Sequence, residues 1–142
     1  MSDWDKFSIE AVVRQILGAK SKRNAHFGRP YLTAYQIAIT IAERHRNTYV
    51  AIGRRIGGKG KGPEQSLARY IAKQLSDRIK DGRISDIEGA FLSGDHLTKL
   101  VYQSSEGEVE PSTGSSHVSM FRLNNISQEA THQHTHAIEE PR

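Results

Sequence analysis

Three segments of this sequence repeat apolar residues at the spacing of an α-helix, and this pattern limits the fold more than any other feature. The segments lie in residues 9–17, 33–46 and 63–81, where apolar side chains recur three and four positions apart. The middle segment is apolar almost all the way round, so we expect its helix at the centre of the core. Thr33 and Gln36 have the spacing of a capping box at its start.

Serine, glycine and proline residues mark the ends of the expected helices. Ser8 can cap the first helix, and a short helix over residues 48–56 should end at Gly57 and Gly58. Pro63 suits the first turn of the third long helix, because the amide hydrogen that proline lacks would have no partner there. The first 82 residues are therefore predicted to be helical, with polar connections.

The remainder of the chain has a different character. Residues 97–103 (LTKLVYQ) and 117–124 (HVSMFRLN) contain alternating β-branched and aromatic residues, which predict the two strands of a hairpin. The acidic, turn-rich residues between them indicate a long mobile loop. From residue 124 onward no core pattern is visible, and we expect a disordered tail.

Composition sets the size and the class of the protein. A chain of 142 residues with 36% hydrophobic content predicts one compact core with extensions. We divide it into residues 1–30 (N-terminal helix and basic loop), 31–123 (main domain) and 124–142 (tail). The absence of cysteine excludes disulfides, cysteine zinc sites and thiol nucleophiles. With no long apolar run and no secretory pattern at the start, we expect a soluble cytoplasmic protein that binds no membrane.

Charge is distributed unevenly along the chain. Residues 1–82 carry 16 lysines and arginines against 7 acidic residues, a net of +9, whereas residues 83–142 carry 4 against 9, a net of −5. Screening at physiological salt acts over about 8 Å, so a ligand responds to such local clusters and not to the total of +4. The basic part is where we expect an anionic partner to bind.

The glycine-rich stretch GGKGKGPEQS, residues 57–66, has the composition of a phosphate-binding loop. A P-loop needs Ser or Thr after its lysine to hold magnesium, but Gly60 follows Lys59 here. The GxxG loop of KH domains needs a strand before its first helix, and the sequence predicts none. The stretch is better interpreted as a flexible basic hinge that leads into the third long helix.

The order of the expected elements resembles the winged helix-turn-helix family. A long buried helix, a short helix, a turn, a basic helix and a β-hairpin follow one another over residues 31–123. The resemblance implies a mainly α fold with a small β-hairpin (α+β), winged-helix-like, with an extra N-terminal helix and a disordered C-terminal tail. In that family the third helix enters the major groove of DNA and the hairpin, or wing, contacts the backbone or an adjacent groove.

Carried over to this chain, the resemblance implies DNA binding of the kind used in transcription regulation. The polar face of the basic helix and the loop before it supply the candidate contacts. These nucleic-acid-binding residues are Arg54, Arg55, Lys59, Lys61, Gln65, Ser66, Arg69 and Lys73. Ser76 and Lys80 continue the same polar face. Two features depart from the family: the glycine-rich turn is long, and the presumed wing carries Glu106, Glu108 and Glu110, which would repel DNA.

Two other classes of function stay open. Winged helices also act as protein-docking modules, so the basic face could bind an acidic partner protein as part of an adaptor or a small assembly. An enzyme would need carboxylates and histidines that meet only in three dimensions. We expect no catalytic residues and no cofactor. We also expect no built metal site, because His132, His134 and His136 lie in the expected tail and favour adventitious metal binding.

Overall fold

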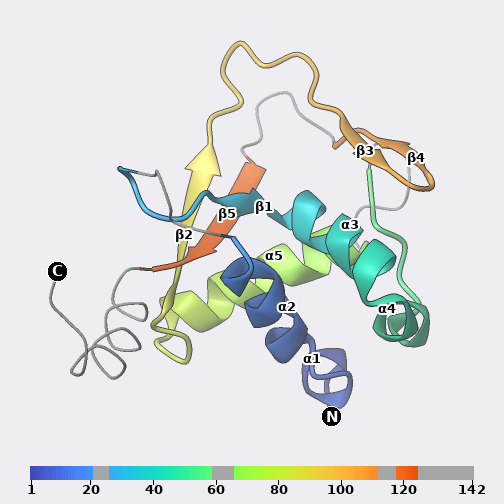
Figure 1. Cartoon of the computed structure of the whole chain (residues 1–142). Coiled ribbons are helices and arrows are strands. Elements are labelled where there is room, and N and C mark those ends of the chain that lie inside the picture. The colour runs from blue at the N-terminus through green and yellow to red at the C-terminus, as the bar shows by residue number, and fades with distance from the viewer. Residues whose placement is uncertain (21–25, 59–65, 112–117, 125–142) are drawn as a thin grey trace, which may run out of the picture.

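The computed structural model describes residues 1–20, 26–58, 66–111 and 118–124. It contains both helices and strands, with most of the strands after the last helix, so the fold is mixed α/β (Figure 1). The helices are α1 (Asp3–Lys6), α2 (Ile9–Gly18), α3 (Ala34–Arg44), α4 (Arg46–Ile52) and α5 (Leu67–Lys80). The strands are β1 (Leu32–Thr33), β2 (Ile87–Leu92), β3 (Tyr102–Ser104), β4 (Gly107–Val109) and β5 (Val118–Leu123).

Helix α3 lies at the centre of the core, as its apolar pattern predicts. Ile37, Ala38 and Ile41 are completely buried in it. The predicted capping box is present, because Thr33 accepts the amide of Gln36 (3.2 Å) while the Gln36 side chain accepts the amide of Thr33 (2.8 Å). Both of these hydrogen bonds satisfy amides that the helix itself cannot pair.

The short helix α4 ends earlier than predicted. Its last residue is Ile52, and Gly53 follows with φ of 73° in the left-handed region. A glycine enters this region without steric cost and ends a helix there. The prediction that Gly57 and Gly58 end the helix is therefore wrong, and residues 54–58 run in an extended path toward α5.

Helix α5 begins later than predicted. Ser66 is its N-cap and accepts the amide of Arg69 (3.1 Å), so the first helical residue is Leu67 and not a residue near Pro63. Pro63 lies outside the described residues. Leu67, Ile71 and Leu75 are completely buried and face α3, which fixes the orientation of the helix.

The main sheet is antiparallel with the strand order β1-β5-β2. The predicted strand at 117–124 is confirmed as β5, but its predicted pairing with residues 97–103 is wrong. Its partner is β2, with Gly89 opposite Phe121. A Cβ on Gly89 would lie 3.4 Å from the Phe121 ring, so this buried aromatic residue packs directly over the glycine. Glycine interrupts the apolar pattern of β2 and hides the strand from a reading of the sequence.

A second small sheet, the β3–β4 hairpin, lies beside α3 and α4, away from the main sheet (Figure 1). Only the end of the strand predicted at 97–103 is extended, and it pairs with β4 inside the predicted loop. The rings of Tyr35 and Tyr102 stack with centroids 6.0 Å apart and an interplanar angle of 12°. The Glu43 side chain accepts the amide of Ser105 (2.6 Å). These contacts attach the hairpin to α3.

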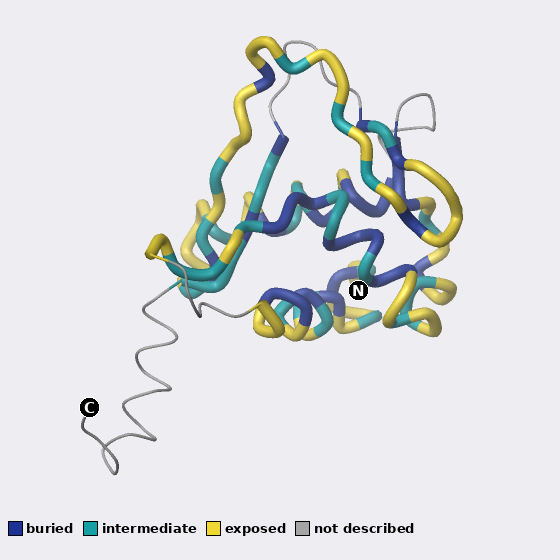
Figure 2. The backbone as a smooth tube through the Cα atoms, turned by 45° about the horizontal axis from the view of Figure 1, so that its top comes forward, coloured by how far each residue is buried: buried dark blue, intermediate teal, exposed yellow. Residues whose placement is uncertain are grey.

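The N-terminal helices share the core with the rest of the chain. Trp4 of α1 is 2% exposed, and Ile9 and Val13 of α2 are completely buried in the same cluster as the apolar residues of α3 and α5. Figure 2 shows this continuous buried interior, with the segment between β2 and β3 running exposed along the outside. Ser8 stands at the N-cap of α2 but makes no capping hydrogen bond through its side chain, in contrast to the prediction.

No helix within the described ranges is both long enough and apolar enough to cross a lipid bilayer. The predicted tail lies outside the described residues from residue 125 onward.

Candidate nucleic-acid interface

The exposed face of α5 carries a line of basic and polar side chains. The opposite face is apolar and buried, so the helix is fixed with one side toward solvent. Four exposed side chains recur at intervals of three and four residues on that side, and we call them the α5 stripe: Arg69, Lys73, Ser76 and Lys80. At 1.5 Å per residue, the stripe is about 16 Å long.

The first amide groups of α5 are used within the protein. The Leu67 N–H donates to the carbonyl of Arg55 (2.7 Å). The next amide donates to the carbonyl of Ile56 (3.0 Å). Ser66 accepts the third amide through its side chain (3.1 Å) and the fourth through its carbonyl (3.0 Å). A phosphate at a helix N-terminus needs such amides, so the stripe and not the end of α5 is the candidate for anion binding.

Ser66 is buried at this junction. It is 2% exposed, and a side chain on Gly57 would place its Cβ only 2.8 Å from the Cβ of Ser66. Gly57 has φ of 123°, in the left-handed region, so glycine is needed there for both conformation and space. The burial of Ser66 speaks against the predicted contact with base or phosphate, because its hydroxyl serves as the cap of α5.

The two arginines before the glycine stretch lie away from the α5 stripe. Arg54 stacks over the ring of Tyr70 (4.1 Å to the centroid) and forms an ion pair with Asp3 of α1 (3.4 Å). Arg55 is exposed and lines a cavity of about 510 Å³ between the end of α4 and the β3–β4 hairpin. Three glutamates line the same cavity: Glu106, Glu108 and Glu110. Their carboxylates make this side of the molecule unfavourable for a polyanion.

Arg69 lies at the end of the stripe that is nearest to the stacked tyrosines. Burial raises the pKa of Tyr35, as does the neighbouring Tyr102, and the Arg69 guanidinium acts in the opposite direction. Lys73 forms an exposed ion pair with Asp77 one turn further along (3.0 Å). Such a surface pair contributes only about 0.3–0.5 kcal/mol, so a phosphate can replace Asp77 as the partner of Lys73.

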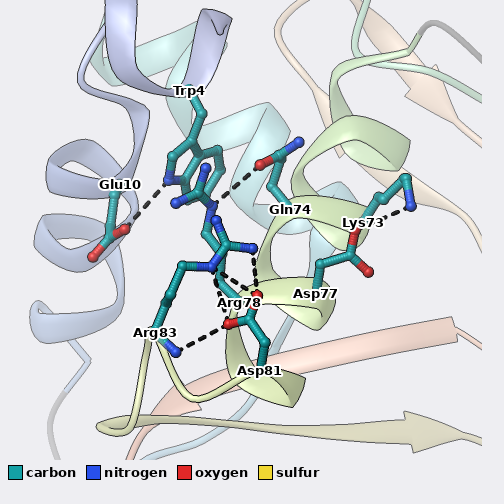
Figure 3. A network of polar contacts seen from close by, with 8 residues as sticks. All are labelled: Trp4, Glu10, Lys73, Gln74, Asp77, Arg78, Asp81 and Arg83. Atoms are coloured by element: carbon teal, nitrogen blue, oxygen red, sulfur yellow. Dashed lines mark hydrogen bonds and ion pairs between the residues drawn. The ribbon is translucent and has the colours of Figure 1, made fainter.

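The side of α5 next to the stripe is covered by α1. Figure 3 shows Arg78 between Gln74, which accepts a hydrogen bond from it (3.1 Å), and the ring of Trp4, over which its guanidinium lies (5.2 Å). The indole N–H of Trp4 in turn donates to Glu10 of α2 (3.3 Å). These contacts hold Arg78 against the protein and leave the stripe as the exposed basic face of the helix.

Lys59, Lys61 and Gln65 lie outside the described residues, as do His132, His134 and His136. Within the described part of the chain, no group of three histidine, aspartate or glutamate side chains lies close enough to hold a metal ion.

A groove that sequence reasoning missed adjoins the stripe. It lies between α5 and β2 with a volume of about 240 Å³, and Ser76 and Lys80 of the stripe line one side of it. Phe91 of β2 lines the other side and is 69% exposed. The sequence pattern that could have indicated the groove is the alternation of Ile87, Gly89 and Phe91, which places these residues on one face of a strand.

The chain was compared with protein-family models, with curated proteins and with solved structures, and no match was found in any of the three comparisons.

Proposed function

We propose that this protein binds nucleic acid, as duplex DNA, through the α5 stripe and catalyses no reaction. The observation that carries the proposal is the exposed row of Arg69, Lys73 and Lys80 on one rigid helix. The major groove of DNA is about 12 Å wide and admits an α-helix. A stripe about 16 Å long can therefore bring its three cations to the phosphates that border the groove.

The proposed fold is a winged helix. Three features support it: α3, α4 and α5 follow one another, α5 is the basic helix, and an antiparallel pair of strands, β2 and β5, comes after it. The long connection between β2 and β5 contains the β3–β4 hairpin, which packs on α3 and does not extend the main sheet. In this proposal α5 is the helix that enters the major groove.

The experiment is a salt titration of binding to a duplex of about 30 base pairs, three helical turns. For wild-type protein we expect log affinity to fall linearly with log salt, with a slope of about −0.9 for each phosphate contacted. The double variant R69A/K73A should bind more weakly and show a slope that is smaller by about 2.

The matched control is Lys6→Ala. Lys6 is an exposed cation on α1, which covers another side of α5, so its removal changes the net charge without touching the stripe. We expect a slope close to that of the wild type. The double variant removes two charges and the control one, so an effect of the control half as large as that of R69A/K73A would show that only net charge matters.

Absence of binding to DNA or RNA at about 50 mM salt, where electrostatic binding is strong, would end the proposal. Purification of the protein with an acidic partner after nuclease treatment, with no nucleic acid carried along, would then support the adaptor function. In that outcome the same R69A/K73A substitutions should release the partner.

A further inference from the structure

The groove between α5 and β2 has a surface that is apolar except at one edge. Ile79 of α5 and Phe121 of β5 line it together with Phe91. Gly89 lies between the two phenylalanines and has no side chain to fill the space. Gly89 therefore contributes only backbone to the lining of the groove.

The charge of the groove is opposite to that of a polyanion. Among the described residues that line it, Lys80 is the one charged side chain, and none is acidic. The cavity beside the β3–β4 hairpin, by contrast, is lined by three glutamates. The groove also shares Lys80 and Ser76 with the α5 stripe, so a duplex that contacts the end of the stripe lies directly against the groove.

We propose that the groove recognises the C5-methyl group of thymine, so that the protein prefers duplex DNA with a T·A pair opposite Phe91. This inference rests on the proposed DNA binding by the α5 stripe. Thymine is the one base that presents a methyl group in the major groove, and phenylalanine is among the side chains that contact it. Lys80 then holds the adjacent phosphate while Phe91 and Ile79 remove the methyl group from water.

The test compares two duplexes of about 30 base pairs that are rich in T·A pairs and identical except that uracil replaces thymine in one. Uracil pairs like thymine but lacks the methyl group, so charge and pairing are unchanged. We expect wild-type protein to bind the thymine duplex about fourfold more tightly, which corresponds to the burial of one methyl group.

Phe91→Ala should bind both duplexes equally, with an affinity close to that of the wild type for the uracil duplex. The control is Val50→Ala, which truncates another exposed apolar side chain, on α4 (63% exposed). It should keep the fourfold preference. Circular dichroism and the unfolding midpoint check that both variants fold.

Two results would overturn the inference while leaving the proposed function intact. One is equal, salt-dependent binding of both duplexes by wild-type protein, which would mean that the groove has another occupant, such as a protein. The other is a thymine preference that persists in Phe91→Ala. Failure to bind either duplex would instead overturn the proposed function itself.

Discussion

The α5 stripe and the β3–β4 hairpin differ in charge and in how they are attached to the core. The stripe stands on a helix whose other face, including Leu67, Ile71 and Leu75, is completely buried. The hairpin is held by the Tyr35–Tyr102 stack, by the buried Val109 (8% exposed) and by polar contacts. The stripe presents cations from a helix with a fully buried face, whereas the hairpin presents carboxylates and contributes one buried apolar residue to the core.

This difference in charge would orient a polyanion, if one binds as we propose. Glu106 and Glu108 are exposed on the hairpin, and Glu106 forms an ion pair with Arg46 (3.2 Å). The hairpin packs beside α3 and α4, and the groove beside β2 lies at the other end of α5. Under the proposed function, DNA on the stripe would therefore be repelled at the hairpin and would lie against the groove.

Reversal of the charges on the stripe should have the largest effect, because it removes the difference in charge between the stripe and the hairpin. The triple variant R69E/K73E/K80E makes both regions acidic, so we expect a loss of DNA affinity of about 100-fold or more, since phosphate contacts dominate such binding. Fluorescence anisotropy with a labelled duplex measures it. An affinity within a few-fold of the wild type would show that DNA binds elsewhere.

Substitution of the glycines between α4 and α5 gives the next largest effect. Gly57→Ala places a Cβ 2.8 Å from that of Ser66 and requires an alanine at φ of 123°, so we expect a loss of about 2–3 kcal/mol in the free energy of unfolding. Gly53→Ala is the control, because it has φ of 73° and nothing within 4 Å of the added Cβ. It should lose about 1 kcal/mol. Urea unfolding of both variants measures the difference, and equal losses would refute the steric argument.

Neutralisation of the hairpin carboxylates should have a smaller effect on DNA affinity. E106Q/E108Q removes two carboxylates that repel DNA, and we expect about a twofold gain in affinity at physiological salt, because charges more than about 8 Å away are largely screened. The gain should grow as the salt concentration falls. A gain that does not depend on salt would contradict an electrostatic cause.

The attachment of the hairpin should weaken at high pH, which is the smallest effect. Burial raises the pKa of both Tyr35 and Tyr102 above the ordinary value of 10.0. A raised pKa means that the folded state favours the neutral phenol. The resulting stabilisation is complete below pH 10 and is lost as the pH rises through the folded pKa values. Chemical denaturation between pH 8 and about 11 measures this loss, and Tyr102→Phe should reduce it.

Local patterns in the sequence were sufficient to predict α2, α3, α4 and α5 and the stripe, whereas α1 was not predicted. The capping box of Thr33 and Gln36 and the period of Leu67, Ile71 and Leu75 involve neighbours on one helix, so the sequence reveals them directly. The exposure of Arg69 and Lys73 follows from the same period. The ends of the helices were less accurate, because Gly53 and Ser66 act through backbone conformation and hydrogen bonds that alternative residues nearby could also supply.

Residue patterns alone established which helical face is basic, that the chain has one core, and that it has no disulfide. The pairing of segments depended on long-range contacts. β5 pairs with β2, and Phe121 of β5 packs over Gly89, a residue 32 positions earlier. The burial of Ser66, the position of Arg54 against Tyr70 and the groove beside Phe91 depend on segments that meet only after folding. Periodicity records which way one element faces, whereas it carries no information about which element will cover it.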